Sequence, residues 1–118
     1  MRGRRPPAPD TFLPLSPAVL AILVVLDGAP RHGYAIAQAV REESGGALRL
    51  DTGPLYRHLR RLLDDGLVEE VDAPERDDDE RRRYYRPTSL GRLVLAAETA
   101  RLEALLGRPR RRATAPRG

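Results

Sequence analysis

Three arginines on one side of a predicted helix are the side chains best suited to bind a ligand. Between Leu55 and Leu62 the chain runs Leu-Tyr-Arg-His-Leu-Arg-Arg-Leu. At about 100° per residue the leucines form one stripe, and Arg57 lies almost opposite it, flanked by Arg60 and Arg61. A guanidinium group binds a phosphate or the edge of a guanine through two parallel hydrogen bonds. The outer side of this helix therefore either contacts nucleic acid or is a solvated surface.

The position of each arginine along the helix suggests what it contacts. Arg57 is nearest the N-terminus, so we expect it to contact base edges, whereas Arg60 and Arg61 are better placed for phosphates. Asp51 or Thr52 is expected to cap this helix, and the backbone amides at Thr52 and Gly53 can bind phosphate there.

Two tyrosines have a double interpretation. Tyr56, inside the arginine-bearing helix, either donates its hydroxyl to a phosphate or flanks the leucine stripe. Tyr34 has the same ambiguity on a second predicted helix, from Gly33 to about Glu43, where it lies opposite an inner face of small and branched apolar residues. His32 is expected in a turn and His58 on the surface, neither as a ligand.

A basic tract with two tyrosines follows an acidic loop. Leu67–Val71 predicts a strand, residues 72–80 a mobile loop, and Arg81–Pro87 the returning strand of a hairpin. A period of two places Arg82 and Arg83 on opposite faces, and the tyrosine on the packed face belongs to the core. We expect Arg82 and Arg83 to contact DNA or, alternatively, to pair with the acidic end of the loop.

That acidic end, residues 77–80, again has two interpretations. It is either a solubilising flexible loop, or a group of charges that repels phosphates of unrelated DNA and so raises specificity.

The remaining segments predict the supporting elements. Ser16-Pro17 begins a largely buried helix that reaches about Leu26, and Leu48–Leu50 fits a short strand or an extended turn. Thr88 caps a last helix that reaches Leu106. That helix has two apolar stripes. One, formed by Leu90, Leu93, Val94 and Ala97, docks on the domain, and the other, formed by Leu95, Leu102 and Leu106, is a candidate dimer seam.

Helix, helix, arginine-bearing helix and hairpin predict a mainly α fold with a small β-hairpin wing, a winged helix-turn-helix followed by a dimerisation helix. The expected divisions are a disordered or loosely packed N-terminal arm at 1–16, the winged domain at 17–87, the dimerisation helix at 88–106 and a disordered basic tail at 107–118. In the arm, Phe12, Leu13 and Leu15 are able to pack on the domain.

Charge is unevenly distributed along the 118 residues, whose formal net charge is +4. Residues 1–10 carry three arginines and one aspartate, residues 107–118 carry five arginines, and residues 11–106 therefore sum to −3. The basic tails can add salt-sensitive nonspecific affinity for DNA. Lysine is absent, which reflects either an adaptation to nucleic acid or a GC-rich genome. The case for DNA binding rests on where individual arginines lie.

Composition argues against several other classes. There is no cysteine, the two histidines are not spaced as metal ligands, and no apolar run approaches the ~20 residues that span a bilayer. We expect no metal, no cofactor and no membrane partner. The N-terminal segment lacks the apolar region of a signal peptide, so a cytoplasmic protein is expected. No nucleophile–base set or glycine-rich phosphate loop indicates an enzyme.

Over residues 15–106 the chain resembles the PadR family of bacterial transcriptional regulators, in its compact subgroup with a single C-terminal helix. The matching motifs, in order, are His32-Gly33-Tyr34 with Ile36; Leu55-Tyr56 with Leu59, Leu62, Gly66, Leu67 and Val68; and Arg83-Tyr84-Tyr85 with Thr88 and Gly91. The resemblance implies a winged-helix homodimer that binds palindromic operator DNA, usually as a repressor, with release by a small molecule in some members. Two departures are the acidic wing tip and the absence of tryptophan, which does not support an aromatic drug pocket between subunits.

Two functions therefore remain open. The first is a homodimeric repressor of sequence-specific, double-stranded DNA, with a small-molecule effector as an additional possible partner. The alternative is a winged-helix module that binds protein or RNA without operator specificity, which the negative charge of residues 11–106 favours.

Overall fold

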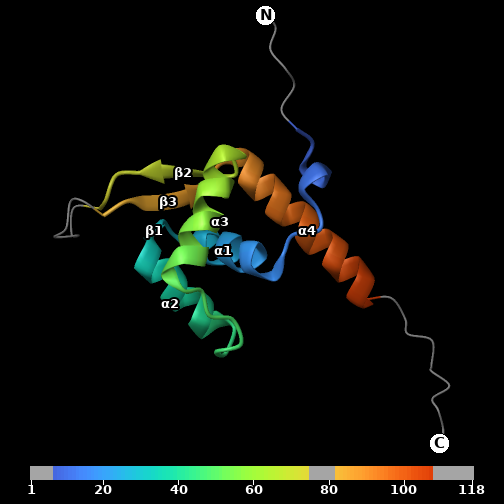
Figure 1. Cartoon of the computed structure of the whole chain (residues 1–118). Helices are drawn as coiled ribbons and strands as arrows, with labels where there is room; N and C mark the ends of the chain where they lie inside the picture. Colours follow the sequence, from blue (N-terminus) through green and yellow to red (C-terminus); the bar gives the residue numbers. More distant parts are fainter. Residues whose placement is uncertain (1–6, 75–81, 108–118) are drawn as a thin grey trace, which may run out of the picture.

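The computed structural model describes residues 7–74 and 82–107. The first residues of the arm, the acidic loop end at 77–80 and the basic tail beyond residue 107 lie outside this part of the chain. In chain order the elements are a 3-10 helix η1 (Pro9–Phe12), α1 (Pro17–Gly28), β1 (Arg31–His32), α2 (Gly33–Glu43), α3 (Thr52–Asp64), β2 (Val68–Val71), β3 (Tyr84–Pro87) and α4 (Ser89–Gly107) (Figure 1). This arrangement is the predicted winged helix, mainly helical with a small sheet.

The sheet has three antiparallel strands in the order β1-β3-β2, one more than the hairpin predicted from the sequence. Arg31 pairs with Tyr85 and His32 with Tyr84, so two residues before α2 form the missed strand. Two residues are too few to show an alternation, and only pairing with β3 identifies them. The returning strand was predicted from Arg81, but β3 begins at Tyr84, so Arg82 and Arg83 precede it.

The core lies where α1, α2, α3 and the sheet meet. Its largest fully buried apolar side chains include Ile22, Leu23 and Leu26 of α1, Ile36 of α2, and Leu59 and Leu62 of α3. Tyr85 is the wing tyrosine on the packed face, and burial raises the pKa of its phenol. The apolar stripes predicted for the helices therefore form one core, on which both α3 and the wing are packed.

Local capping sets the helix starts. The Ser16 hydroxyl accepts the Val19 amide at 3.2 Å and begins α1 as predicted. His32, expected as a turn residue, caps α2 because its Nδ1 accepts the Ala35 amide at 3.2 Å. Between α2 and α3, residues 48–50 form no strand and run as an extended connection, in which the Ser44 hydroxyl accepts the Leu48 amide at 2.9 Å.

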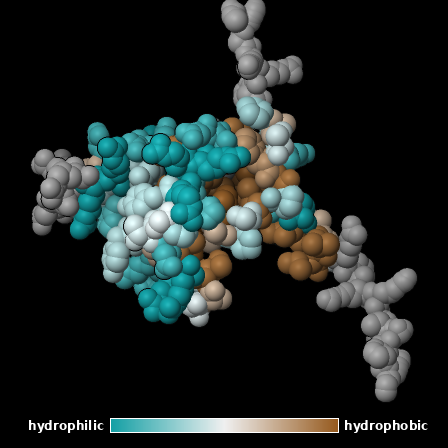
Figure 2. All heavy atoms as spheres, in the orientation of Figure 1, coloured by the Kyte–Doolittle hydropathy of each residue, from teal (hydrophilic) through white to brown (hydrophobic). Residues whose placement is uncertain are grey.

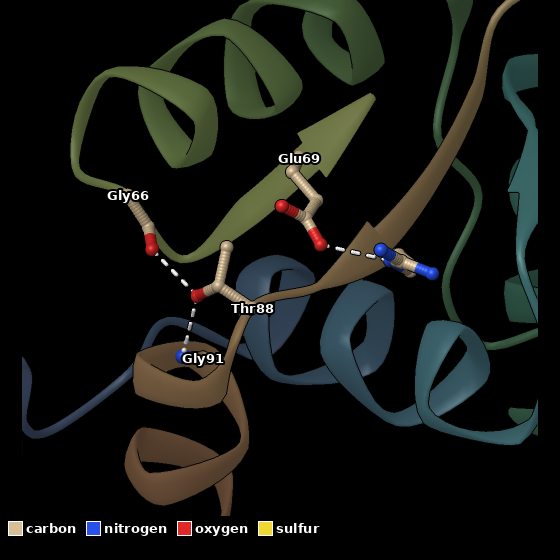
Figure 3. A network of polar contacts seen from close by, with 5 residues as sticks. Gly66, Glu69, Thr88 and Gly91 are labelled. Carbon is tan, nitrogen blue, oxygen red and sulfur yellow. Dashed lines mark hydrogen bonds and ion pairs between the residues drawn. The ribbon is translucent and has the colours of Figure 1, made fainter. Parts of the chain in front are cut away.

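Thr88 joins the end of α3, the base of the wing and the start of α4 (Figure 3). Its hydroxyl donates to the Gly66 carbonyl at 2.6 Å and accepts the Gly91 amide at 3.0 Å. A Cβ on Gly91 would overlap the Leu67 carbonyl oxygen. Glycine is therefore required where α4 crosses the beginning of the wing.

The described part of the N-terminal arm, which includes η1, lies against α4 and far from the wing (Figure 1). Phe12, Leu13 and Leu15 are partly buried against the core, so these residues of the arm are packed on the domain. The Leu15 amide donates to Glu98 Oε2 at 2.9 Å. Among the described residues Glu98 is the one fully buried charged side chain, 1 % exposed. No helix of the described chain has the length and apolar character needed to cross a membrane.

Candidate nucleic-acid interface

Helix α3 separates an apolar side from a basic side. Leu55, Leu59 and Leu62 are 1–2 % exposed, whereas Arg57 and Arg60 on the opposite side are exposed. Because the leucines fix the rotation of the helix about its axis, they also fix the direction in which the arginines point. Figure 2 shows hydrophilic residues gathered over the wing, α2 and α3, and hydrophobic residues over α4.

The three arginines of α3 differ in their partners. Arg61 Nε donates to Asp65 Oδ2 at 3.2 Å, one helical turn further on. In residues 7–74 and 82–107 no ion pair involves Arg57 or Arg60. Arg57 Nη1 would lie 3.6 Å from a Cβ on Gly53, so its guanidinium extends back over the start of α3.

The start of α3 lies beside that guanidinium. Thr52 and Gly53 are exposed, and the side chain of the capping residue Asp51 accepts no hydrogen bond from the first turn. Exposed first-turn amides and a guanidinium together form a surface on which an anion is favoured. Arg57, Thr52 and Gly53 were each predicted near the start of this helix, and in the structure the Arg57 guanidinium lies beside Gly53.

Tyr56 and Tyr34 lie near the junction of α2 and α3. The Tyr56 ring lies against Gly33, since a Cβ there would overlap its hydroxyl, yet 46 % of Tyr56 stays exposed. Tyr56 therefore packs on α2 and is also accessible, and its contact with a phosphate stays a prediction. Tyr34 is 73 % exposed and stacks on the His32 ring with a centroid distance of 6.4 Å.

The wing arginines have partners within the fold. Arg86 Nε donates to Glu69 Oε2 at 2.8 Å, and Arg83 Nη1 donates to Glu70 Oε1 at 2.9 Å. The acidic partners predicted from the sequence were residues 77–80, which lie outside the described chain. The two glutamates of β2 were not predicted as partners. Arg82 contacts His32, with 3.4 Å between its Nη1 and the ring Nε2.

The apolar stripes of α4 are divided differently from the prediction. Leu95 of the predicted seam is half-buried and packs against the core, and Leu102 is also half-buried, while Leu106 is 79 % exposed. Leu93 was assigned to the docking stripe but is 56 % exposed. Glu98 was missed altogether. Its position between Leu95 and Leu102 on the helix was the available signal, because a lone carboxylate within an apolar stripe requires a partner.

A cavity of about 320 Å³ is open at the surface of the described part of the chain. It lies between α1 and the end of α2 and is lined by Leu20, Val24, Val25, Val40 and Leu48 among others. No group of three or more metal-ligating side chains occurs in the described residues.

Comparison with known proteins identifies relatives of this fold. Solved structures that match include a PadR family transcription regulator from hypervirulent Clostridium difficile, with a TM-score of 0.68 and 25 % identity over 78 % of this chain and 93 % of that one. RosR from H. salinarum matches with a TM-score of 0.60 and 30 % identity over 81 % of this chain and 78 % of that one. A complex structure of hsRosR-S4 matches with a TM-score of 0.70 and 25 % identity over 88 % and 84 % of the two chains. Curated protein sequences yielded no match.

The family comparison covers most of the winged domain and the first half of α4. The model of the PadR-like family of transcriptional regulators matches residues 22–97, well over half of the chain. These residues include the buried stripe and exposed arginines of α3, the sheet and the Thr88 junction. The chain belongs to the PadR-like family of transcriptional regulators.

Proposed function

We propose that this regulator is a homodimeric repressor that acts in the cytoplasm and binds a palindromic operator with α3. The observation that carries the proposal is the basic side of α3, where Arg57 and Arg60 are exposed and have no ion-pair partner within the described residues. Guanidinium groups in this state lose little on binding DNA, since no internal contact has to break.

Within that proposal each residue has a role set by its position. Arg57 contacts base edges in the major groove, and Arg60 contacts phosphates. Thr52 and Gly53 offer backbone amides to a phosphate at the start of α3. Tyr56, whose ring rests on Gly33, directs its exposed part to the backbone of the DNA.

The exposed leucines of α4 support the homodimer. Leu93, Leu105 and Leu106 are each more than half exposed, on a helix whose last turns extend beyond the domain (Figure 1). A second copy that covers them removes this apolar surface from water at about 25 cal/mol per Å². In sedimentation experiments Leu106→Glu should shift dimer toward monomer, and the exposed polar substitution Thr99→Ser should not.

Release by a small-molecule effector completes the proposal. The open apolar groove of about 320 Å³ between α1 and α2 supports it, because a ligand there touches the end of α2 and the connection that leads into α3.

The deciding experiment is selection of bound duplexes from a random library with the full chain, followed by footprinting. We expect an inverted repeat with half-sites about 34–36 Å apart, the separation of successive major grooves on one face of DNA. Equal affinity for every duplex would contradict a sequence-specific repressor. If the protein bound no duplex but retained RNA or a protein, the alternative interaction module, consistent with the charge of −3 over residues 11–106, would replace it.

A further inference from the structure

We infer that Glu69 and Glu70 determine specificity by occupying the wing guanidinium groups of Arg86 and Arg83, which limits sequence-independent binding to DNA phosphates. The inference rests on the DNA-binding function proposed above. It assigns a role to two acidic residues of β2 that stand outside the proposed contacts with DNA.

The geometry of both pairs comes from the sheet register. Glu69 lies directly opposite Arg86 in the β2–β3 ladder, so their side chains share one face, and Nε and Oε2 are 2.8 Å apart. Figure 3 shows the Glu69 carboxylate directed from β2 toward β3, where this contact is made. Glu70 lies opposite Tyr85 and reaches Arg83, two residues before Tyr85, with 2.9 Å between Oε1 and Nη1.

The two pairs lie on opposite faces of the hairpin. Glu69 and Arg86 are on the outer face, which also carries Tyr84, while Glu70 and Arg83 are on the same face as the buried Tyr85. An arginine is therefore paired on each face of the wing, whichever face approaches the DNA.

Stability alone gives little reason to keep these pairs. The four side chains are between 39 % and 67 % exposed, and ion pairs in such positions typically contribute about 0–1 kcal/mol to folding. For a DNA-binding protein the consequence is larger. A phosphate has to replace the glutamate at the guanidinium, and the displaced carboxylate stays nearby and repels the phosphate.

Specificity depends on the ratio of the affinity for operator DNA to the affinity for unrelated DNA. Contacts with phosphates strengthen both, whereas base contacts strengthen only the operator. By occupying Arg83 and Arg86, the glutamates remove two contacts of the first kind and leave Arg57 on α3 unaffected. Unrelated DNA is held by phosphate contacts alone and loses both of them, whereas the operator complex is held in register by base contacts at α3 and depends less on the wing. The ratio of operator affinity to unrelated affinity therefore rises.

The test uses the full chain with Glu69→Gln, Glu70→Gln and the double substitution. Asp72→Asn is the matched control, because Asp72 is an exposed carboxylate of the same wing that forms no ion pair within the described residues. It changes the charge by the same amount but frees no arginine. Affinity is measured by fluorescence anisotropy for a selected operator and an unrelated duplex of equal length, across a salt series, with thermal unfolding as a check on folding.

We expect each glutamine variant to bind the unrelated duplex roughly 3- to 10-fold more tightly near 0.15 M salt, with a log–log salt slope steeper by about one. Operator affinity should rise by a smaller factor, so that the ratio of operator affinity to unrelated affinity falls. Equal factors for the two duplexes would contradict a role in specificity. Asp72→Asn should leave the salt slope unchanged.

If the glutamine variants bound the unrelated duplex with the same affinity and salt slope as Asp72→Asn, the inference would be overturned. Operator binding by the unmodified chain would in that case still support the proposed function. A large loss of unrelated-duplex affinity in Arg83→Gln or Arg86→Gln would also overturn it, because these arginines would then already bind phosphates. Absence of binding to any duplex by the unmodified chain would instead reject the proposed function, and this inference with it.

Discussion

Helix α3 and the wing both present arginines to solvent, yet they differ in what lies next to each guanidinium. Around Arg57 the residues one turn away are Gly53, Pro54, Arg60 and Arg61, none of which is acidic. In the wing, strand pairing places Glu69 and Glu70 within hydrogen-bond distance of the arginines on β3 and just before it.

The comparison shows that a count of exposed arginines overestimates the cationic surface available to a ligand. When a carboxylate lies 2.8 Å from a guanidinium, it already compensates part of the positive charge. On binding DNA, that guanidinium exchanges the carboxylate for a phosphate. A guanidinium with only backbone amides and other arginines nearby gains its first anionic partner. We therefore rank α3 above the wing as a DNA contact.

The largest effect is expected where both regions are attached to the domain. Gly91→Ala forces a Cβ against the Leu67 carbonyl oxygen, and overpacking against backbone should lower the free energy of unfolding by about 1–3 kcal/mol. Denaturant unfolding measures this, and DNA binding by α3 and the wing should weaken together. Gly107→Ala is the control, since no atom lies within 4 Å of a Cβ at that position.

Arg57→Ala should separate the two regions directly. If Arg57 contacts a guanine, the substitution should cost about 1–3 kcal/mol of operator affinity and relax the preference at one base position. Arg86→Ala, by the same anisotropy assay, should change operator affinity only slightly, because Glu69 already occupies that guanidinium. If Arg57→Ala and Arg86→Ala lost the same operator affinity, α3 would not rank above the wing as a DNA contact.

Glu98 provides an ion pair with one buried partner for comparison with the exposed wing pairs, since Glu98 is 1 % exposed and Arg101 is 42 % exposed. Hydrogen bonds from Arg101, at 2.6 and 3.1 Å, and from the Leu15 amide hold the pKa of Glu98 below its ordinary value against the opposing effect of burial. The folded state therefore binds fewer protons, so this stabilisation is present above the ordinary glutamate pKa and is lost as pH falls through the lowered value.

Acid unfolding curves should show that loss in the unmodified chain and a weaker pH dependence in Glu98→Gln. A Glu98→Gln curve parallel to the unmodified one would mean that the carboxylate does not stabilise the arm.

The smallest difference is expected within α3 itself. Arg60→Ala should reduce the salt slope of operator binding by about one, the change for one lost phosphate contact. Arg61→Ala should reduce it less, because Asp65 at 3.2 Å already pairs with Arg61. If Arg61→Ala reduced the salt slope more than Arg60→Ala, the Arg61–Asp65 pair would have to open when the protein binds DNA.

Much of the fold followed from local patterns. Gly33–Glu43 matches the predicted helix, and Ser16 and Thr88 cap their helices as expected. Capping and leucine periodicity involve residues only three or four positions apart, so the sequence displays them. The predicted direction of the α3 arginines follows from the same periodicity.

The errors concern partners that lie far along the chain. Strand β1 exists through pairing with β3, and the half-burial of Leu95 reflects packing on the core. Glu98 bonds to Leu15 across 83 positions, and no local pattern specifies that contact. The exposure of Leu93 was missed because two apolar stripes on one helix do not reveal which of them docks.

From the sequence by itself one obtains helices with defined starts, a leucine stripe and arginines opposite it, because a helix fixes the relative directions of neighbouring side chains. Tertiary structure alone decided that the wing arginines have carboxylate partners. Glu69 and Arg86 are 17 positions apart and Glu70 and Arg83 are 13 apart, so a hairpin register has to form before carboxylate and guanidinium meet. Charge available for binding is therefore a property of the folded chain, while charge present is a property of the sequence.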